Sequence, residues 1–152
     1  MGDREQLLAR VEEARRGFLA AIEGLTDEQM TRPAVGEWSV KDLLCHVASY
    51  EEMALPDMQR VARGDAPALA TFDLKRVDEY NAMIMSLRRH FSLEQAWREL
   101  DISRRSLLEA ISRLPDSALA EGQFARGMLQ ICAYHDTEHT EDIQAWRKRE
   151  GL

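Results

Sequence analysis

Four stretches of the sequence carry apolar residues at alternating spacings of three and four, the period of an amphipathic α-helix. They run from Asp3 to Gly24, from Ser39 to about Arg63, from Leu93 to Leu114 and from Phe124 to Trp146. A weaker helical pattern spans Asp73 to about His90. No strand pattern of any length is present. The sequence therefore predicts an all-α four-helix bundle with one shorter extra helix, as a single domain over residues 1–152.

Polar residues mark where two of these helices begin, and Thr26 marks the start of a single helical turn after the first helix. Thr26 and Ser92 are each followed three residues later by Gln, and Ser39 by Asp42, which is the spacing of a capping box. Pro33 and Gly36 predict an irregular loop, and Pro56 should kink the second long helix or end its regular part. The connection between the second and third long helices is too long for a tight turn. These two helices are therefore free to run parallel in an up-down-down-up bundle.

Composition narrows the class of protein. Hydrophobic residues make up 45% of the chain and charged residues 31%, as in soluble globular proteins. The net charge is −7 and no long Lys/Arg-rich run stands out, so nucleic acid is not expected as a partner. No signal peptide or membrane span is recognised, which predicts a cytoplasmic protein without membrane contact. Cys45 and Cys132 lie in apolar helical stretches, as expected of reduced core thiols.

The last helical stretch places two histidines on its interior face. The predicted seam is Phe124, Met128, Ile131, Cys132, His135, His139, Asp142, Ile143 and Trp146. The opposite, polar face includes Asp136. His135 and His139 are one turn apart and project in the same direction. A buried imidazole without a partner is costly, and a shared metal ion would supply a partner for both.

A third ligand comes from the second long helix. His46 lies in an apolar stretch and can point inward, whereas His90 ends a polar run and is expected to be solvated. Three histidines leave coordination positions open, as in catalytic metal sites, and suit zinc, nickel, copper or iron. Asp42, Glu51, Glu138 or Asp142 would orient a ligand ring, and the sequence does not choose among them. The alternative is a set of core histidines that are hydrogen-bonded to the protein and inert.

The order of these features resembles a known family. The stretch from Gly36 to His46 reads G-x-W-S-x-x-D-x-x-x-H, and His135-x-x-x-His139 follows in the last helix. Together they resemble the DinB/YfiT-like superfamily over nearly the whole chain. The resemblance implies an up-down-down-up bundle, a nickel or zinc ion on His46, His135 and His139, and a homodimer.

The resemblance also suggests chemistry. Relatives include S-transferases that use low-molecular-weight thiols, a thiol-dependent isomerase and proteins described as hydrolases. We therefore expect a metal-dependent enzyme in which the ion activates a low-molecular-weight thiol as co-substrate, or a water, toward a small electrophilic substrate. No residue is assigned as catalytic acid or base. Two alternatives are a bundle that binds a small molecule without turnover and an interaction protein with an acidic surface.

Overall fold

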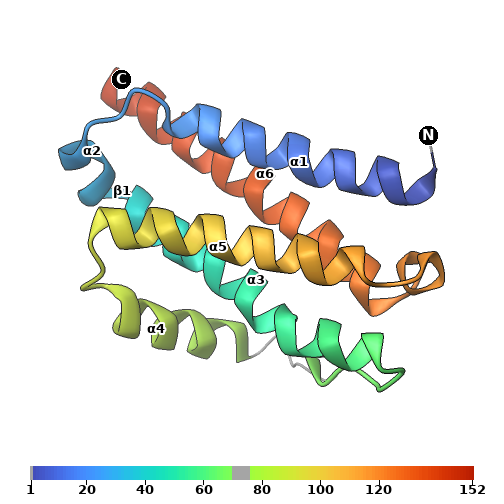
Figure 1. Ribbon diagram of the computed structural model, residues 1–152. Helices are drawn as coiled ribbons and strands as arrows, with labels where there is room; N and C mark the ends of the chain where they lie inside the picture. Colours follow the sequence, from blue (N-terminus) through green and yellow to red (C-terminus); the bar gives the residue numbers. More distant parts are fainter. Residues whose placement is uncertain (1, 70–75) are drawn as a thin grey trace.

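The computed structural model describes residues 2–69 and 76–152, which form a helical bundle (Figure 1). Its long helices are α1 (Asp3–Ile22), α3 (Val40–Ala62), α5 (Leu93–Ser112) and α6 (Phe124–Glu150). The shorter elements are α2 (Asp27–Thr31), α4 (Val77–Arg88), the 3-10 helix η3 (Asp116–Leu119) and the strands β1 (Pro33–Val35) and β2 (Trp38–Ser39). The predicted all-α class and the count of four long helices are confirmed. The predicted start of the extra helix, residues 73–75, lies outside the described residues.

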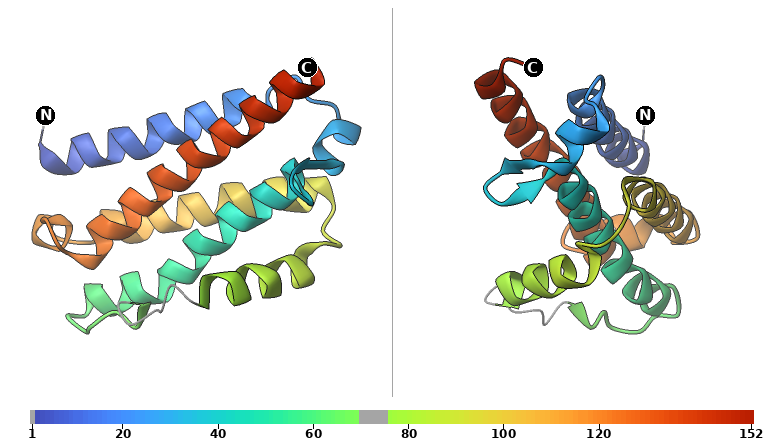
Figure 2. Two further views of the ribbon diagram at one scale, coloured as in Figure 1. Left: turned by 180° about the vertical axis from the view of Figure 1, so that it is seen from behind. Right: turned by 90° about the vertical axis from the view of Figure 1, so that its left-hand side faces the viewer.

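The long helices run up, down, down and up. In Figures 1 and 2, α1 and α6 point in one direction, and α3 and α5 point in the other. The best-packed pairs are α1 with α6 and α3 with α5, so both are parallel pairs. Helix α4 lies against α3 and carries the chain back along the bundle before α5 begins. Because α4 returns the chain to the end of the bundle where α3 begins, α3 and α5 can run parallel, as predicted.

The predicted helix starts are present. In α3, the Ser39 hydroxyl accepts a hydrogen bond from the Asp42 backbone N–H, and the Asp42 carboxylate accepts one from the Ser39 backbone N–H. Equivalent boxes begin α2 at Thr26 and α5 at Ser92. Pro56 was expected to kink the second long helix or to end its regular part. It does not end the helix, since α3 continues past Pro56 to Ala62. Buried residues on both sides of the proline, Ala54 and Met58 among them, hold the helix in the core.

A small hairpin replaces the predicted irregular loop. β1 pairs antiparallel with β2, with Pro33 opposite Ser39 and Val35 opposite Trp38. Gly36 sits between the strands with φ of +60°, a backbone conformation that side chains disfavour. Strands of three and two residues are too short to show an alternating pattern, so the hairpin has no strand signal in the sequence. The hairpin fixes Trp38 at the entrance to α3.

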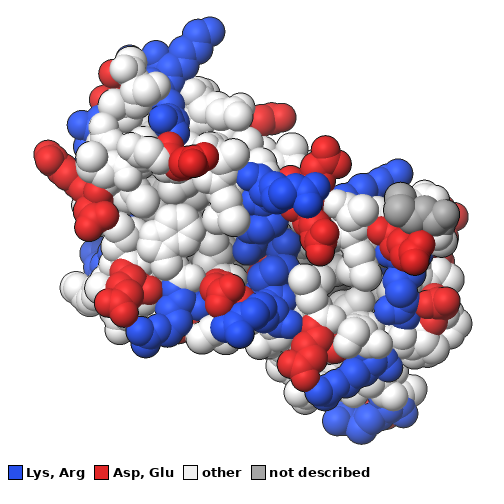
Figure 3. Space-filling view, turned by 45° about the horizontal axis from the view of Figure 1, so that its top comes forward, with Lys and Arg blue, Asp and Glu red and all other residues white. Residues whose placement is uncertain are grey.

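The apolar core is divided into two clusters. The first lies toward the hairpin and includes Phe18, Val47, Leu100 and Ile143. The second lies toward the opposite end and includes Val11, Ala54, Leu107 and Cys132. Basic side chains form a narrow band across one face of the molecule, with acidic side chains beside it (Figure 3). Among the described residues, no helix has the length and apolar character needed to cross a membrane.

The interior face of α6 is rotated from the predicted seam. Ile131 was expected inside, yet it is 43% exposed, whereas Asp136 was expected outside and is fully buried. At 100° per residue, the buried residues of α6 centre roughly 50° away from the predicted seam. They are Ala125, Met128, Leu129, Cys132, Asp136, His139, Ile143 and Trp146. His135 consequently lies at the edge of the buried stripe and keeps partial access to solvent.

Candidate metal centre

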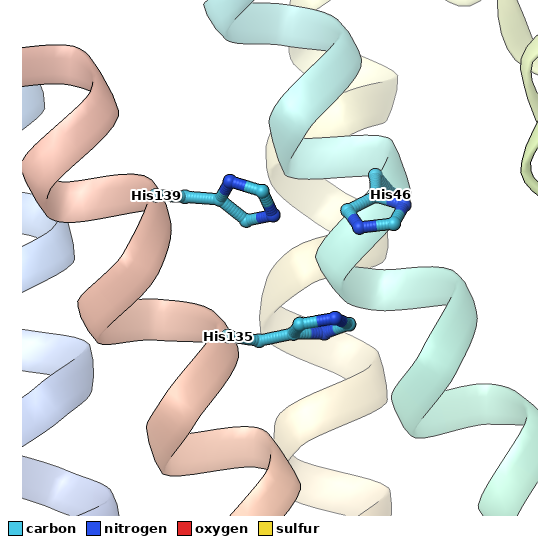
Figure 4. Close-up of side chains that lie close together, drawn as sticks. All are labelled: His46, His135 and His139. Carbon is cyan, nitrogen blue, oxygen red and sulfur yellow. The ribbon is translucent and has the colours of Figure 1, made fainter.

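Three histidines meet between α3 and α6. His46 projects from α3, and His135 and His139 project from successive turns of α6 toward it (Figure 4). One nitrogen from each ring lies within 4.8 Å of the other two. The ring centroids are 5.0 Å apart for His46 and His135, 5.2 Å for His46 and His139, and 5.6 Å for His135 and His139. The structure thus brings together the three predicted ligand residues. His90 is exposed beyond the end of α4 and is not part of the cluster.

The ring of His139 is oriented by a carboxylate. Its Nδ1 lies 3.0 Å from Oδ2 of Asp142, one turn further along α6. A carboxylate only accepts hydrogen bonds, so this contact selects the neutral tautomer in which Nδ1 carries the proton and Nε2 keeps its lone pair. Nε2 is buried and has no hydrogen-bond partner among the described residues. This buried acceptor faces the other two imidazoles, which is the arrangement expected of a metal ligand.

The other candidate carboxylates have different partners. Asp42 caps α3 through Ser39. Glu138 is exposed and accepts a hydrogen bond from the Tyr134 hydroxyl at 3.3 Å. Glu51 is buried among arginines on the far side of α3 from the solvent. Of these four carboxylates, Asp142 is therefore the one that contacts a histidine side chain. The direction of each side chain, which the sequence does not show, decides between them.

Burial keeps the imidazoles of His46 and His135 neutral. The apolar surroundings of His46, followed by the neighbouring His135 and His139, lower the pKa of its imidazole to about 3. Burial and then the nearby His139 also lower the pKa of His135. Both rings are therefore unprotonated at neutral pH. A neutral imidazole is the form that binds a metal ion, so binding need not displace a proton from either ring.

Aromatic rings enclose the histidines on the hairpin and α4 sides. The Trp38 ring centroid is 5.0 Å from that of His46. The Tyr50 ring meets His46 at 5.0 Å and His135 at 4.7 Å, both edge to face. The Tyr50 hydroxyl donates to Oδ1 of Asn81 at 2.9 Å, which ties this ring to α4. The role of Tyr50 was not predicted from the sequence, although this residue lies one turn after His46 on α3.

A layer of four charged side chains, of which three are buried and Arg15 is partly exposed, lies beside the histidines and was not predicted. It consists of Arg15 on α1, Glu51 on α3, Arg104 on α5 and Asp136 on α6. Arg15 contacts Glu51 at 2.7 Å and Asp136 at 3.0 Å. Arg104 contacts Glu51 at 2.6 Å and Asp136 at 2.9 Å. Each carboxylate is thus bound by both guanidinium groups, and the four-charge layer has no net charge.

A spacing signal for the four-charge layer is present in the sequence. Arg15 follows Val11 by four residues and precedes Phe18 by three, and Arg104 stands in the same way between Leu100 and Leu107. Glu51 and Asp136 also follow core residues by four, namely Val47 and Cys132. A charge of each sign at core positions on different helices is the pattern of a buried ion network.

Comparison with known proteins supports the assignment of the fold. A family model described as the DinB superfamily matches residues 10–143. Among solved structures, the chain is similar to an uncharacterised protein from Escherichia coli UTI89, with a TM-score of 0.82 and 14% sequence identity. That match covers 97% of this chain and 94% of the other. No curated protein matches the sequence significantly.

Proposed function

The chain belongs to the DinB superfamily, and from that premise we propose that it is a metal-dependent enzyme. In this proposal His46, His135 and His139 bind one divalent ion, with nickel or zinc as the first candidates. When bound by three imidazoles with positions left open, such an ion acts as a Lewis acid toward a thiol or a water. The proposed reaction is attack of a low-molecular-weight thiol, or of water, on a small electrophilic substrate.

One observation carries the proposal: three histidine nitrogens from two helices, one from each ring, lie within 4.8 Å of one another. His46 is 4% exposed and His139 is 8% exposed. The buried Nε2 of His139 has no partner in the described part of the chain, and a core of inert histidines would have to satisfy that acceptor. A borderline-soft divalent ion suits three imidazole donors and satisfies Nε2.

The surroundings of the triad suit a small organic substrate. Trp38 and Tyr50 present ring faces and edges beside His46, and rings of this kind pack against apolar parts of a ligand. His135 lies at the edge of the buried stripe, so the triad is reachable from that side. In this proposal the aromatic residues bind the substrate, and the three histidines and Asp142 hold the ion.

Metal content tests the proposal directly. Protein purified without a His tag or chelator, or reloaded with zinc or nickel, should contain about one divalent ion per chain. His46→Ala and His135→Ala should lose it while keeping their helical circular dichroism. His90→Ala is the matched control, because this histidine lies outside the cluster, and it should keep the ion. A parent protein that takes up neither metal would overturn the proposal.

Spectroscopy and turnover measurements distinguish a thiol from water as the nucleophile. If a thiol is the co-substrate, adding low-molecular-weight thiols to cobalt-loaded protein should change its visible spectrum. If water is the nucleophile, hydrolysis of activated esters or amides should proceed through many turnovers and disappear in His135→Ala. A bound ion combined with ligand binding but no turnover in either screen would identify a binding protein instead.

A further inference from the structure

We infer that the four-charge layer of Arg15, Glu51, Arg104 and Asp136 positions the three histidines relative to one another. The inference rests on the proposed function, because it concerns how the metal ligands are held. Glu51 and Asp136 are then positioning residues, since neither touches the triad in the contacts described above. The two arginines extend the same role to α1 and α5, which carry no ligand.

The layer joins the two helices that carry the ligands. Oε1 of Glu51 on α3 accepts from Arg15 and from both Nε and Nη2 of Arg104. Oδ2 of Asp136 on α6 accepts from the same two guanidinium groups. The other oxygen of Glu51 accepts from the Ser103 hydroxyl at 2.9 Å. Helices α3 and α6 are thus connected through α1 on one side and α5 on the other.

Short stretches of helix transmit this connection to the ligands. Glu51 follows His46 by five residues on α3, and Asp136 lies between His135 and His139 on α6. The Thr140 hydroxyl also donates to the Asp136 carbonyl at 2.6 Å within this turn. Because an α-helix rises only 1.5 Å per residue and is stiff over such distances, fixing the two carboxylates fixes the backbone beneath all three rings.

The arginine–carboxylate hydrogen bonds of the four-charge layer fix the distance between α3 and α6 more closely than apolar packing does. The guanidinium group is planar and presents its donors in a rigid fork, whereas burial of apolar surface has no preferred direction. The four-charge layer is also the place where the apolar core is interrupted, between the first cluster and the second. The separation of α3 from α6 beside the histidines is therefore set by directional contacts.

A charge-balanced pair of substitutions tests the inference. Glu51→Gln with Arg104→Gln removes one charge of each sign and leaves Arg15 paired with Asp136. Leu107→Ala is the control, because it lies one turn from Arg104 on α5, is fully buried and loses core packing without touching the layer. The readouts are the imidazole NMR shifts of the metal-free proteins and the affinity and visible spectrum of bound cobalt.

The double variant should shift the imidazole resonances and bind cobalt about 10- to 100-fold more weakly, with an altered spectrum. Leu107→Ala should keep the cobalt spectrum and affinity of the parent, even if it is less stable. If the double variant does not fold, Arg104→Lys keeps the charge but loses the fork, and should change the same readouts in the same direction. Imidazole shifts and cobalt binding like those of the parent would overturn the inference.

This experiment tests the proposed metal site and the positioning role of the four-charge layer independently. If the parent binds no cobalt, the proposed metal chemistry fails, while the imidazole shifts of the metal-free variants still decide whether the layer positions the rings. If the parent and the variants bind cobalt alike, with unchanged imidazole shifts, the metal site stands and the positioning role is excluded.

Discussion

Asp142 orients His139 by holding its Nδ1 at 3.0 Å, so that Nε2 faces His46 and His135. Replacing this carboxylate should weaken the triad without removing a ligand. We expect Asp142→Asn to bind zinc about 10- to 100-fold more weakly than the parent, because the amide no longer favours the tautomer that frees Nε2. Competition with a chromophoric chelator measures this change. Glu138→Gln, one residue from His139 but turned to solvent, should bind as the parent does, and equal weakening in both variants would contradict the orienting role.

Metal binding should stabilise the folded protein. An ion that binds only the native state adds about 2.7 kcal/mol to the free energy of unfolding at 100 times its Kd. Zinc should therefore raise the thermal midpoint of the parent, and a chelator should reverse the effect. His139→Gln, which replaces a ligand, should unfold at the same temperature with and without zinc. A zinc-dependent rise of equal size in this variant would place the ion elsewhere on the protein.

The two cysteines should be unreactive in the folded state. Burial raises the pKa of Cys45 to about 11 and that of Cys132 to about 12. At pH 8 only about one thiol in a thousand, or fewer, is ionised, and thiolates are the reactive form. Ellman's reagent should therefore detect no rapid thiol in native protein and two after unfolding in urea. One fast-reacting thiol in the native protein would show that the core is open at that cysteine.

The raised pKa values of the two cysteines also predict that the folded protein becomes less stable at alkaline pH. An unfolded cysteine ionises near pH 8.5, well below the pKa values of about 11 and about 12 of the folded cysteines. Above that pH the unfolded chain releases protons that the native state retains, so the free energy of unfolding should fall as the pH rises toward 11. Urea titrations between pH 8 and 10.5 measure the slope. Replacing both cysteines with alanine should make the slope shallower, and an unchanged slope would assign it to other groups.

The second apolar cluster should be sensitive to cavities. Leu107 is fully buried, and Leu107→Ala should lower the free energy of unfolding by about 2–5 kcal/mol. Leu87 on α4 is 65% exposed, so Leu87→Ala should change it by no more than about 0.5 kcal/mol. Urea unfolding followed by circular dichroism measures both. Similar losses in the two variants would mean that α4 packs more closely than its exposure indicates.

The sequence predicts much of the fold because local signals and burial agree. The apolar spacing locates the four long helices, and Thr26, Ser39 and Ser92 mark helix starts through hydrogen bonds that involve neighbouring residues only. The three histidines are identifiable for the same reason, since each lies at or near an interior position of its helix. The β1–β2 hairpin is missed because strands of three and two residues are too short to show a period.

The rest of the site depends on contacts between helices that are distant in sequence. Four carboxylates were candidates to orient a histidine, and only the direction of the side chain on α6 selects Asp142. Asp136 was assigned to the polar face of its helix because a carboxylate, taken alone, is most often solvated. Asp136 and Ile131 show where apolar periodicity misleads. Because the buried residue Asp136 is polar, it was left out of the predicted interior face, and that face was centred too close to Ile131, which is exposed.

The interrupted core has a consequence for folding. Apolar seams alone would tolerate a helix displaced by one turn, about 5.4 Å along its axis, with little loss of buried area. In this bundle such a slip would carry Arg104 into an apolar cluster, away from both of its carboxylates, at a cost of several kcal/mol. Misregistered packings are therefore selected against during folding, and each folded copy brings His46 opposite the same two histidines.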